Sequence, residues 1–231
     1  MLTLEGLRIT WPDFTLTADL TVPSGARVAI IGPSGAGKST LLAAIAGFQP
    51  LGAGRILWDG RDLSPLPPGQ RPISILFQDN NLFPHLTATQ NVGLGLRPDL
   101  RLSPVEQDRV ATALARVGLD GYGARKPGAL SGGQQSRVAL ARVLLRARPL
   151  LLLDEPFSAL GPALKAEMLA LVRDIATESG ATLLMVTHDP RDAERITDQT
   201  VLVADGHAAP PRPTAALFAD PPPALRDYLG K

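Results

Sequence analysis

Hydrophobic and polar positions along this chain follow two patterns, one typical of strands and one typical of helices. Residues 2–22 alternate apolar and polar side chains in two short stretches, which predicts a pair of antiparallel strands. Nearly continuous apolar runs come later, at Val28–Ile31, Ile73–Phe77, Leu150–Leu153, Leu183–Val186 and Thr200–Val203. Such runs are typical of strands that are buried on both faces of a parallel sheet. The pattern therefore predicts a sheet that is antiparallel at first and parallel afterwards.

Helical periodicity fills the segments between these runs. It predicts helices at Leu41–Gly47, Val105–Val117, Gln134–Arg146 and Ala163–Thr177. Strand signals vanish between Asn80 and Pro149, so we expect a helical insertion at about 80–149 within a single α/β domain of residues 1–231. The last 20 residues are rich in proline and too short for another domain.

A glycine-rich loop joins the strand at Val28–Ile31 to the helix that follows. It comprises Gly32, Pro33, Ser34, Gly35, Ala36, Gly37, Lys38, Ser39 and Thr40, which fit the pattern G-x-x-x-x-G-K-[ST] between strand and helix. Glycines let backbone N–H groups turn toward one anion, and the helix start adds the positive end of its dipole. We expect Lys38 to bind the β- and γ-phosphates of a nucleotide and the Ser39 hydroxyl to bind Mg²⁺.

Two carboxylates stand at the end of the apolar strand Leu150–Leu153, where open α/β sheets place their ligands. Asp154 is suited to hold Mg²⁺ through water, and Glu155 to polarise an attacking water as a general base. Acidic residues also end strands simply because the chain returns to solvent. The phosphate loop upstream favours the catalytic interpretation.

A second anion-binding surface is predicted where the helix at Gln134–Arg146 begins. Ser131, Gly132, Gly133 and Gln134 follow Leu130 and expose N–H groups and a hydroxyl at a helix start. The alternative is an ordinary helix cap, which is the commoner use of such a sequence.

These motifs together resemble the ATP-binding-cassette (ABC) ATPases. The phosphate loop, Gln78, Leu130–Gln134, Leu150–Pro156 and His188 occur in the order and spacing of that family, over residues 2–220. The resemblance implies a phosphate-loop NTPase core with a mostly parallel sheet, an N-terminal antiparallel β subdomain and the α-helical insertion. It also implies that Leu130–Gln134 is the signature motif, which closes on ATP held by the phosphate loop of a second copy in a head-to-tail homodimer.

The same resemblance assigns roles to three further residues. Gln78 is expected to sense Mg²⁺ and the attacking water, and His188 to contact the γ-phosphate, so that both act with Glu155 in hydrolysis. Adenine recognition is expected from the ring of Trp11, with Phe14 as the alternative, although either ring could instead pack against the antiparallel strands.

The chain departs from the family pattern at two places. After the catalytic glutamate the family has Ser-Ala-Leu-Asp, whereas this chain has Gly161 followed by Pro162. We expect the loss of that aspartate to slow hydrolysis or loosen its coupling, mainly through lost contacts across the dimer. The second departure is Ser136, where the family prefers Gln or Arg, and its expected effect is minor.

Composition excludes several classes of protein. Charged residues make up 19% of the chain and the net charge is +1, so no basic stripe points to nucleic acid. There are no cysteines, which rules out disulfides and thiolate metal sites. No apolar run approaches the roughly 20 residues needed to cross a bilayer, and the N-terminus does not resemble a signal peptide. We therefore expect a soluble protein, attached peripherally to the cytoplasmic face of the inner membrane through partners.

A cassette with no membrane span resembles the energy-coupling subunit of an importer, which implies integral permease subunits and a substrate-binding protein as partners. Among importers the likeness is greatest to those for thiamine, through Arg71–Phe83, Asn91–Leu96, Leu183–Val186 and Val203–Gly206. Import of iron, molybdate, sulfate or a polyamine is the alternative, and residues Asn80–Leu86 are expected to receive a short helix of the permease.

The sequence lacks features that two other classes of nucleotide-binding protein require, and it leaves a third class open. A DNA-repair or chromosome-structuring cassette needs a long coiled coil, and the segment between Thr40 and Leu130 is too short for one. A GTPase switch needs an Asn-Lys-x-Asp motif, which is absent. A regulatory ATP-binding protein without a transport role stays open because of Gly161.

Overall fold

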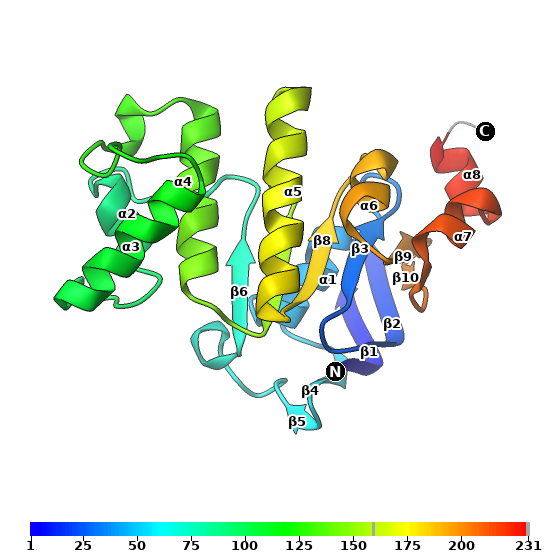
Figure 1. The fold of residues 1–231 in the computed structure, drawn as a ribbon. Helices are drawn as coiled ribbons and strands as arrows, with labels where there is room; N and C mark the ends of the chain where they lie inside the picture. The colour runs from blue at the N-terminus through cyan, green and yellow to red at the C-terminus, as the bar shows by residue number, and fades with distance from the viewer. Residues whose placement is uncertain (159, 230–231) are drawn as a thin grey trace. The chain divides into compact units, whose positions relative to one another are not determined.

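The computed structural model describes residues 1–158 and 160–229, which fall into two compact units. The first unit contains residues 1–73, 149–154 and the chain from 176 onward, and the second contains 74–148 and 155–175. Figure 1 traces the chain through both units.

The first unit begins with β1 (Leu2–Trp11) and β2 (Phe14–Val22), the antiparallel pair that the alternating pattern predicted. Two further strands follow, β4 (Ala53–Trp58) and the short β5 (Arg61–Asp62). β1 pairs with both β2 and β4, and its buried side chains are Leu2, Leu4, Leu7 and Ile9. The register shifts between Leu4 and Leu7 in the pairing with β2 and between Glu5 and Arg8 in the pairing with β4, which keeps apolar side chains on one face through the irregularity.

The parallel part of the sheet carries the apolar runs. Its strands are β3 (Arg27–Ile31), β7 (Leu150–Asp154), β8 (Thr182–Val186) and β9 (Gln199–Ala204). β3 lies between β9 and β8 and is parallel to both, and β7 is parallel to β8. The short strand β10 (His207–Ala208) pairs with both β2 and β9, and so connects the antiparallel strands to the parallel ones. The resulting strand order in this unit is β5-β4-β1-β2-β10-β9-β3-β8-β7. The α1 helix (Lys38–Ala46) packs against β7 and β8. The predicted α/β fold, antiparallel at the N-terminus and mostly parallel elsewhere, is confirmed.

The chain after β8 forms elements that the sequence pattern did not predict. They are α6 (Pro190–Ile196), β11 (Arg212–Pro213), α7 (Thr214–Ala219) and α8 (Pro223–Leu229). β11 pairs with β9, α6 packs against β3, and α7 packs against α6 and β9. The proline-rich tail is therefore folded onto the first unit rather than extended from it (Figure 1).

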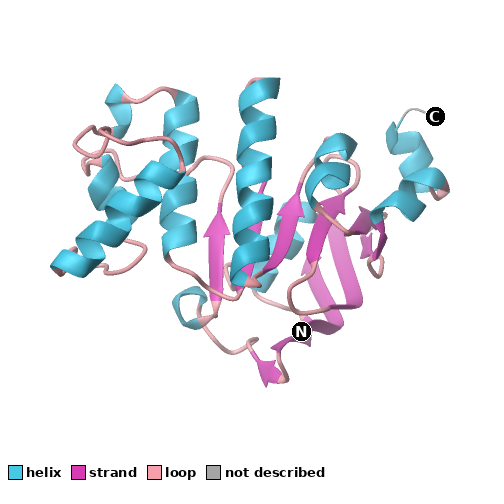
Figure 2. Ribbon diagram, viewed as in Figure 1, coloured by secondary structure: helices cyan, strands magenta, loops and turns pink. Residues whose placement is uncertain are grey.

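The second unit is helical beyond β6 (Ile73–Leu76), the strand along which the chain enters it. Its helices are α2 (Ala88–Gly93), α3 (Pro104–Arg116), α4 (Gly132–Leu145) and all but the last turn of α5 (Pro162–Ser179). A short 3₁₀ turn at Pro127–Ala129 lies within the unit, and another at Pro68–Gln70 precedes it. Figure 2 shows no strand between β6 and β7. α2, α3 and α4 pack on one another, and each begins with a capping box, at Thr87, Ser103 and Ser131. The bounds 80–149 for the insertion stay a prediction, since this unit also takes in residues after Asp154.

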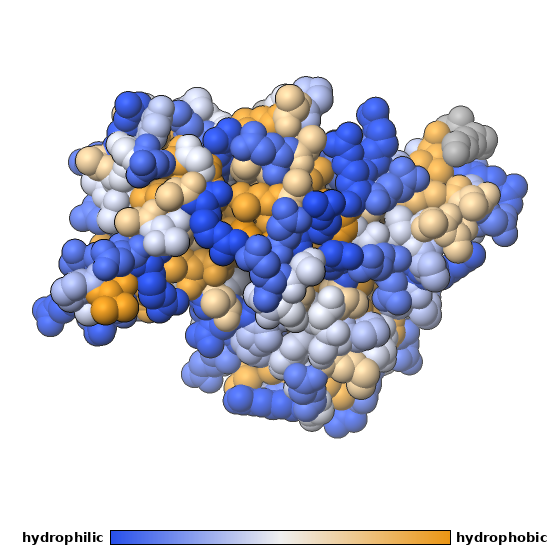
Figure 3. All heavy atoms as spheres, viewed as in Figure 1, coloured by the Kyte–Doolittle hydropathy of each residue, from blue (hydrophilic) through white to orange (hydrophobic). Residues whose placement is uncertain are grey.

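The surface is mixed in character. On the face drawn in Figure 3, hydrophilic residues are spread among smaller hydrophobic areas. Within residues 1–158 and 160–229, no helix combines the length and the hydropathy that crossing a bilayer requires.

A buried arginine closes the C-terminal end of α1, the helix that follows the phosphate loop. Arg71 is 4% exposed, and its Nη1 donates to the carbonyls of Ala44 and Ile45 at 2.8 Å each. Its Nε donates to Leu66 O at 2.9 Å. No basic residue lies in the last turn of α1, so this cation from a distant segment offsets the negative end of the helix dipole. Burial lowers the pKa of Arg71 while nearby Asp62 raises it, and the group remains a cation.

We expect Arg71→Met to lower the free energy of unfolding by about 2–4 kcal/mol, because several buried carbonyls lose a charged donor. The matched control is Arg55→Met, since Arg55 is 61% exposed and pairs with Glu5 at the surface. Its loss is expected to cost less than about 1 kcal/mol. Urea denaturation of the two variants measures the difference. Equal effects would mean that Arg71 does not support α1.

Candidate nucleotide-binding site

The backbone of the phosphate loop permits no side chain at its two key glycines. At Gly32, φ is 147°, and an added Cβ would lie 1.9 Å from the carbonyl oxygen of Val203. At Gly37, φ is 99°, and an added Cβ would lie 2.8 Å from the ring of Phe14. The loop is therefore held closely between β9 and the β1–β2 hairpin, and only glycine fits at these positions.

The start of α1 has the groups that bind an anion. Its N-cap is Gly37, which supplies no side-chain acceptor, and its first turn contains no acidic residue. The N–H groups of this turn thus keep their capacity to donate, and the positive end of the helix dipole is not offset by a carboxylate. Lys38 is 8% exposed, and its Nζ donates to Gly32 O and Pro33 O at 2.8 Å each. The ammonium group is therefore held inside the curve of the loop.

Two oxygen ligands of a kind that suits Mg²⁺ meet beside the loop. Ser39 Oγ donates to Asp154 Oδ1 over 2.9 Å, although the two residues are 115 positions apart. Ser39 lies in the first turn of α1, and Asp154 is the last residue of β7, at the carboxyl end of the parallel strands. A hydroxyl and a carboxylate in contact fit a small hard cation. The structure thus brings together the two metal ligands predicted for this unit.

A shallow pocket of about 420 Å³ adjoins the phosphate loop. Its walls combine the β1–β2 turn, the loop and the turn between β9 and β10, and the lining residues are Asp13, Phe14, Thr15, Pro33, Ser34, Gly35, Ala36, Asp205 and Gly206. Sequence reasoning missed the contribution of Asp205 and Gly206, because nothing in their local pattern shows that their turn lies beside the loop.

The two candidate aromatic residues occupy different places. Phe14 lines the pocket beside the loop, whereas Trp11 does not, although the two rings lie 5.8 Å apart at the turn of the hairpin. Both side chains are partly exposed. The choice of Trp11 for adenine stays a prediction, with Phe14 the ring in contact with the pocket.

His188 follows β8 in an anchored turn. Its side chain is exposed, while the neighbouring Thr187 is 4% exposed and donates from Oγ1 to Asp192 Oδ2 at 2.8 Å. The backbone N–H of Asp189 donates to Thr187 Oγ1 at 3.1 Å, and Asp189 is the N-cap of α6. The residues on both sides of His188 are therefore fixed from α6.

The remaining predicted residues lie in the second unit. Gln78 is exposed and follows β6 by two positions. Glu155 directly follows β7 and has φ of 44°, in the left-handed region that non-glycine residues rarely adopt. Such strained backbone is often found at functional sites. The structure thus gives Glu155 a distinctive conformation at the expected position.

The signature segment is a well-formed helix start. Ser131 Oγ accepts from the N–H of Gln134 at 3.3 Å, and Gln134 Oε1 accepts from the N–H of Ser131 at 3.0 Å. Ser131 is thus a helix cap, which was the alternative to an anion-binding role for this segment. Gly132 is open to solvent, but a Cβ at Gly133 would lie 2.7 Å from Leu164. Gly133 therefore packs closely against α5, so a larger residue there would require the Leu164 side chain to move, and Gly132 leaves the helix tip accessible.

Gly161 occupies a position that can accept a side chain. Its carbonyl accepts from the N–H of Lys165 at 2.9 Å, so it caps α5, and an added Cβ would meet none of the atoms of residues 1–158 and 160–229 within 4 Å. We expect Gly161→Asp to raise the rate of ATP hydrolysis, with a change in unfolding free energy of only a few tenths of a kcal/mol. ATPase assays on the variant test this, with Gly69→Asp as the control for an added charge at an open glycine. An unchanged rate would count against the importance of the missing aspartate.

The comparison with protein families gives the class. Residues 16–158 match the family model described as ABC transporter. Together with the full-length relatives below, this shows that the chain belongs to the ABC transporter family, as the sequence motifs predicted.

The relatives narrow the class further. One relative is the thiamine import ATP-binding protein ThiQ of Cereibacter sphaeroides. It is 68% identical to this chain over 230 residues, and the match covers 100% of both chains. The chain is 52% identical over 209 residues, covering 90% of both chains, to the protein of the same name from Escherichia coli K12. Among solved structures, it is similar to the dimeric ATP-binding cassette MJ0796 in a post-hydrolysis state bound to ADP and Pi. The TM-score is 0.82 and the sequence identity is 30%, and the match covers 93% of this chain and 99% of the other.

Proposed function

We propose that this chain is the ATP-hydrolysing subunit of an importer for thiamine. The observation that carries the proposal is full-length identity of 68% to a protein named for thiamine import, together with the intact phosphate loop and Ser39–Asp154 contact. The ATPase of an importer need not touch the imported solute, so the substrate is inferred from the relatives and not from a pocket.

The residues of the first unit support binding of Mg-ATP. The N–H groups of residues 32–40 and the Lys38 ammonium would bind the β- and γ-phosphates, and the pocket beside the loop is large enough for part of the nucleoside. Ser39 and Asp154 would hold Mg²⁺, with Gln78 as a further ligand. When bound, Mg²⁺ neutralises charge that develops on the phosphoryl oxygens.

Hydrolysis is assigned to three residues of this chain. The Glu155 carboxylate orients and deprotonates the attacking water, His188 donates a hydrogen bond to the γ-phosphate, and Gln78 positions the water. Glu155 follows β7 at the edge where Asp154 ends the strand, so the metal ligand and the base are adjacent in sequence.

A second copy of the chain would complete each site. Ser131–Gln134 begins α4 with an exposed serine and glycine, a helix tip suited to a phosphate. The structural relative MJ0796 is dimeric. We infer a head-to-tail homodimer in which the signature segment of one copy covers ATP on the phosphate loop of the other.

The loop at 80–86 is preorganised as a docking surface for a permease. Arg142 donates to the carbonyls of Asn80 and Asn81 at 3.0 and 2.9 Å, and both asparagines have positive φ. Asn91 is fully buried, and its side chain bonds to both the N–H and the carbonyl of Phe83. The Phe83 ring is nevertheless 47% exposed. A rigid loop that presents an exposed ring suits a partner protein. We propose that binding to the permease holds the chain at the cytoplasmic face of the inner membrane.

Reconstitution tests the proposal. The chain, copurified with its permease subunits and placed in liposomes, is expected to hydrolyse ATP faster when a thiamine-loaded binding protein is added. The same binding protein without thiamine is the control for solute-independent stimulation. Stimulation by a binding protein loaded with iron, molybdate, sulfate or a polyamine, and not by thiamine, would contradict the assignment. Failure to copurify with any permease would favour a regulatory ATP-binding protein.

A further inference from the structure

The C-terminal helix reaches back to the turn that carries His188. Tyr228, in α8, donates its hydroxyl to the backbone carbonyl of His188 at 2.5 Å, across 40 positions of sequence. Both residues belong to the first unit. Because the acceptor is a backbone carbonyl, the bond requires a donor on the side chain of residue 228 and does not involve the imidazole of His188.

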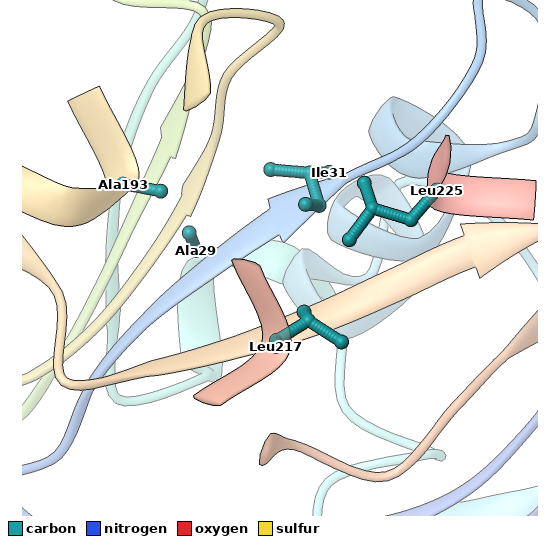
Figure 4. Close-up of a cluster of buried hydrophobic side chains, with 5 residues drawn as sticks. All are labelled: Ala29, Ile31, Ala193, Leu217 and Leu225. Atoms are coloured by element: carbon teal, nitrogen blue, oxygen red, sulfur yellow. The ribbon is translucent and has the colours of Figure 1, made fainter. Parts of the chain in front are cut away.

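Hydrophobic packing holds α7 and α8 in place. Leu217 is 1% exposed and Leu225 is fully buried, in a cluster with Ala29, Ile31 and Ala193. Figure 4 shows the side chains of Leu217 and Leu225 beside the strand that carries Ile31. The ring of Tyr228 packs against the same cluster, as do Leu202, Phe218 and Leu229. The tail is thus docked by a small apolar core of its own.

The cluster includes residues of two elements that adjoin the candidate nucleotide site. Ala29 and Ile31 lie on β3, which runs directly into the phosphate loop, and Ala193 lies on α6, which begins just after His188. A tail packed on both elements places Tyr228 at a fixed distance from the His188 turn.

We propose that Tyr228 is a positioning residue for ATP hydrolysis, which acts by fixing the backbone of His188 from the C-terminal helix. The inference rests on the proposed role of His188 at the γ-phosphate. Thr187 is already bonded to Asp192, and the hydroxyl of Tyr228 adds a second anchor, at the backbone carbonyl of His188 itself. With both ends fixed, the imidazole can move only about its own side-chain torsions.

Removing this anchor should affect the transition state more than the binding of ATP. A shift of a catalytic group by a fraction of an ångström lowers the rate, whereas most of the binding energy comes from the phosphate loop. For Tyr228→Phe we expect kcat to fall about three- to tenfold, the range that corresponds to one hydrogen bond. KM and the affinity for ATP should change less than about twofold.

The chain offers a matched control. Tyr122 is the other of its two tyrosines, lies in the second unit, and has Arg125 over its ring at 4.2 Å. Tyr122→Phe removes the same atom and should leave kcat unchanged. The full-length variants are compared for steady-state hydrolysis, ATP affinity, melting temperature, and hydrogen exchange at the amides of Thr187, His188 and Asp189. We expect faster exchange there in Tyr228→Phe alone.

His188→Ala separates this inference from the function on which it depends. If His188→Ala retains full turnover, the proposed role of His188 is wrong, whatever Tyr228 does. If His188→Ala is inactive but Tyr228→Phe matches the wild type in kcat and in amide exchange, the positioning role of Tyr228 is overturned. A parallel fall in ATP affinity and melting temperature, with kcat preserved, would also overturn it, because a purely structural tail predicts that outcome.

Discussion

A Glu155→Gln variant should bind ATP as the wild type does and hydrolyse it at least about 100-fold more slowly. General-base catalysis typically accelerates a reaction by at least about that factor, and the variant loses this acceleration. The amide keeps the shape of the side chain but cannot accept the proton of the attacking water. Binding should be retained because the phosphate loop, Lys38 and Ser39 are unaltered. Single-turnover hydrolysis and equilibrium binding of ATP, measured on the same preparation, separate the two effects.

The control for this variant lies in the same helical unit. Glu167 is an exposed residue of α5, and Glu167→Gln removes the same charge away from the site. It should hydrolyse ATP at the wild-type rate. Full turnover by Glu155→Gln would remove Glu155 from the mechanism, while a loss of ATP binding would show that the residue acts on the nucleotide and not on water.

A Lys38→Ala variant is expected to bind ATP roughly ten- to hundredfold more weakly, since hydrogen bonds to a charged group are typically worth about 1.5–3 kcal/mol. The ammonium group is held by the carbonyls of Gly32 and Pro33, inside the loop where a phosphate would sit. Its removal leaves the N–H groups of the loop in place, so binding should weaken rather than vanish. Titration of ATP followed by calorimetry measures the change.

Lys126→Ala provides the comparison for net charge, because Lys126 is an exposed residue of the second unit. It should bind ATP with unchanged affinity. Equal weakening in both variants would mean that the effect is one of overall charge, and unaltered binding by Lys38→Ala would contradict the assignment of the loop.

Local sequence patterns predicted the elements whose causes are local. The apolar runs at Val28–Ile31 and Leu183–Val186 became β3 and β8, because buried parallel strands need continuous hydrophobic residues. The Ser131 start of α4 was predictable from the serine and the Gln134 three positions later. The position of Asp154 at the carboxyl end of β7 followed from the apolar run that precedes it.

Features that depend on distant partners could not be predicted in this way. The short helices α7 and α8 have little periodicity of their own and are stabilised by packing on Ile31 and Ala193. The buried cation of Arg71 acts on carbonyls of α1 that lie 26 and 27 positions earlier. A single tyrosine in a proline-rich tail likewise gives no sign that it bonds to the turn of His188.

Enclosure of ATP between two copies of the chain is tested most directly by mixed cross-linking. The chain contains no cysteine, so Ala36→Cys in one preparation and Gly132→Cys in another introduce single thiols into the phosphate loop and the signature segment. Both carry Glu155→Gln to retain ATP. With a short thiol-specific cross-linker, the mixture should give an ATP-dependent covalent dimer, and neither protein alone should do so. Bound ATP without cross-linked mixed dimer, or equal cross-linking of either protein with itself, would contradict the head-to-tail arrangement.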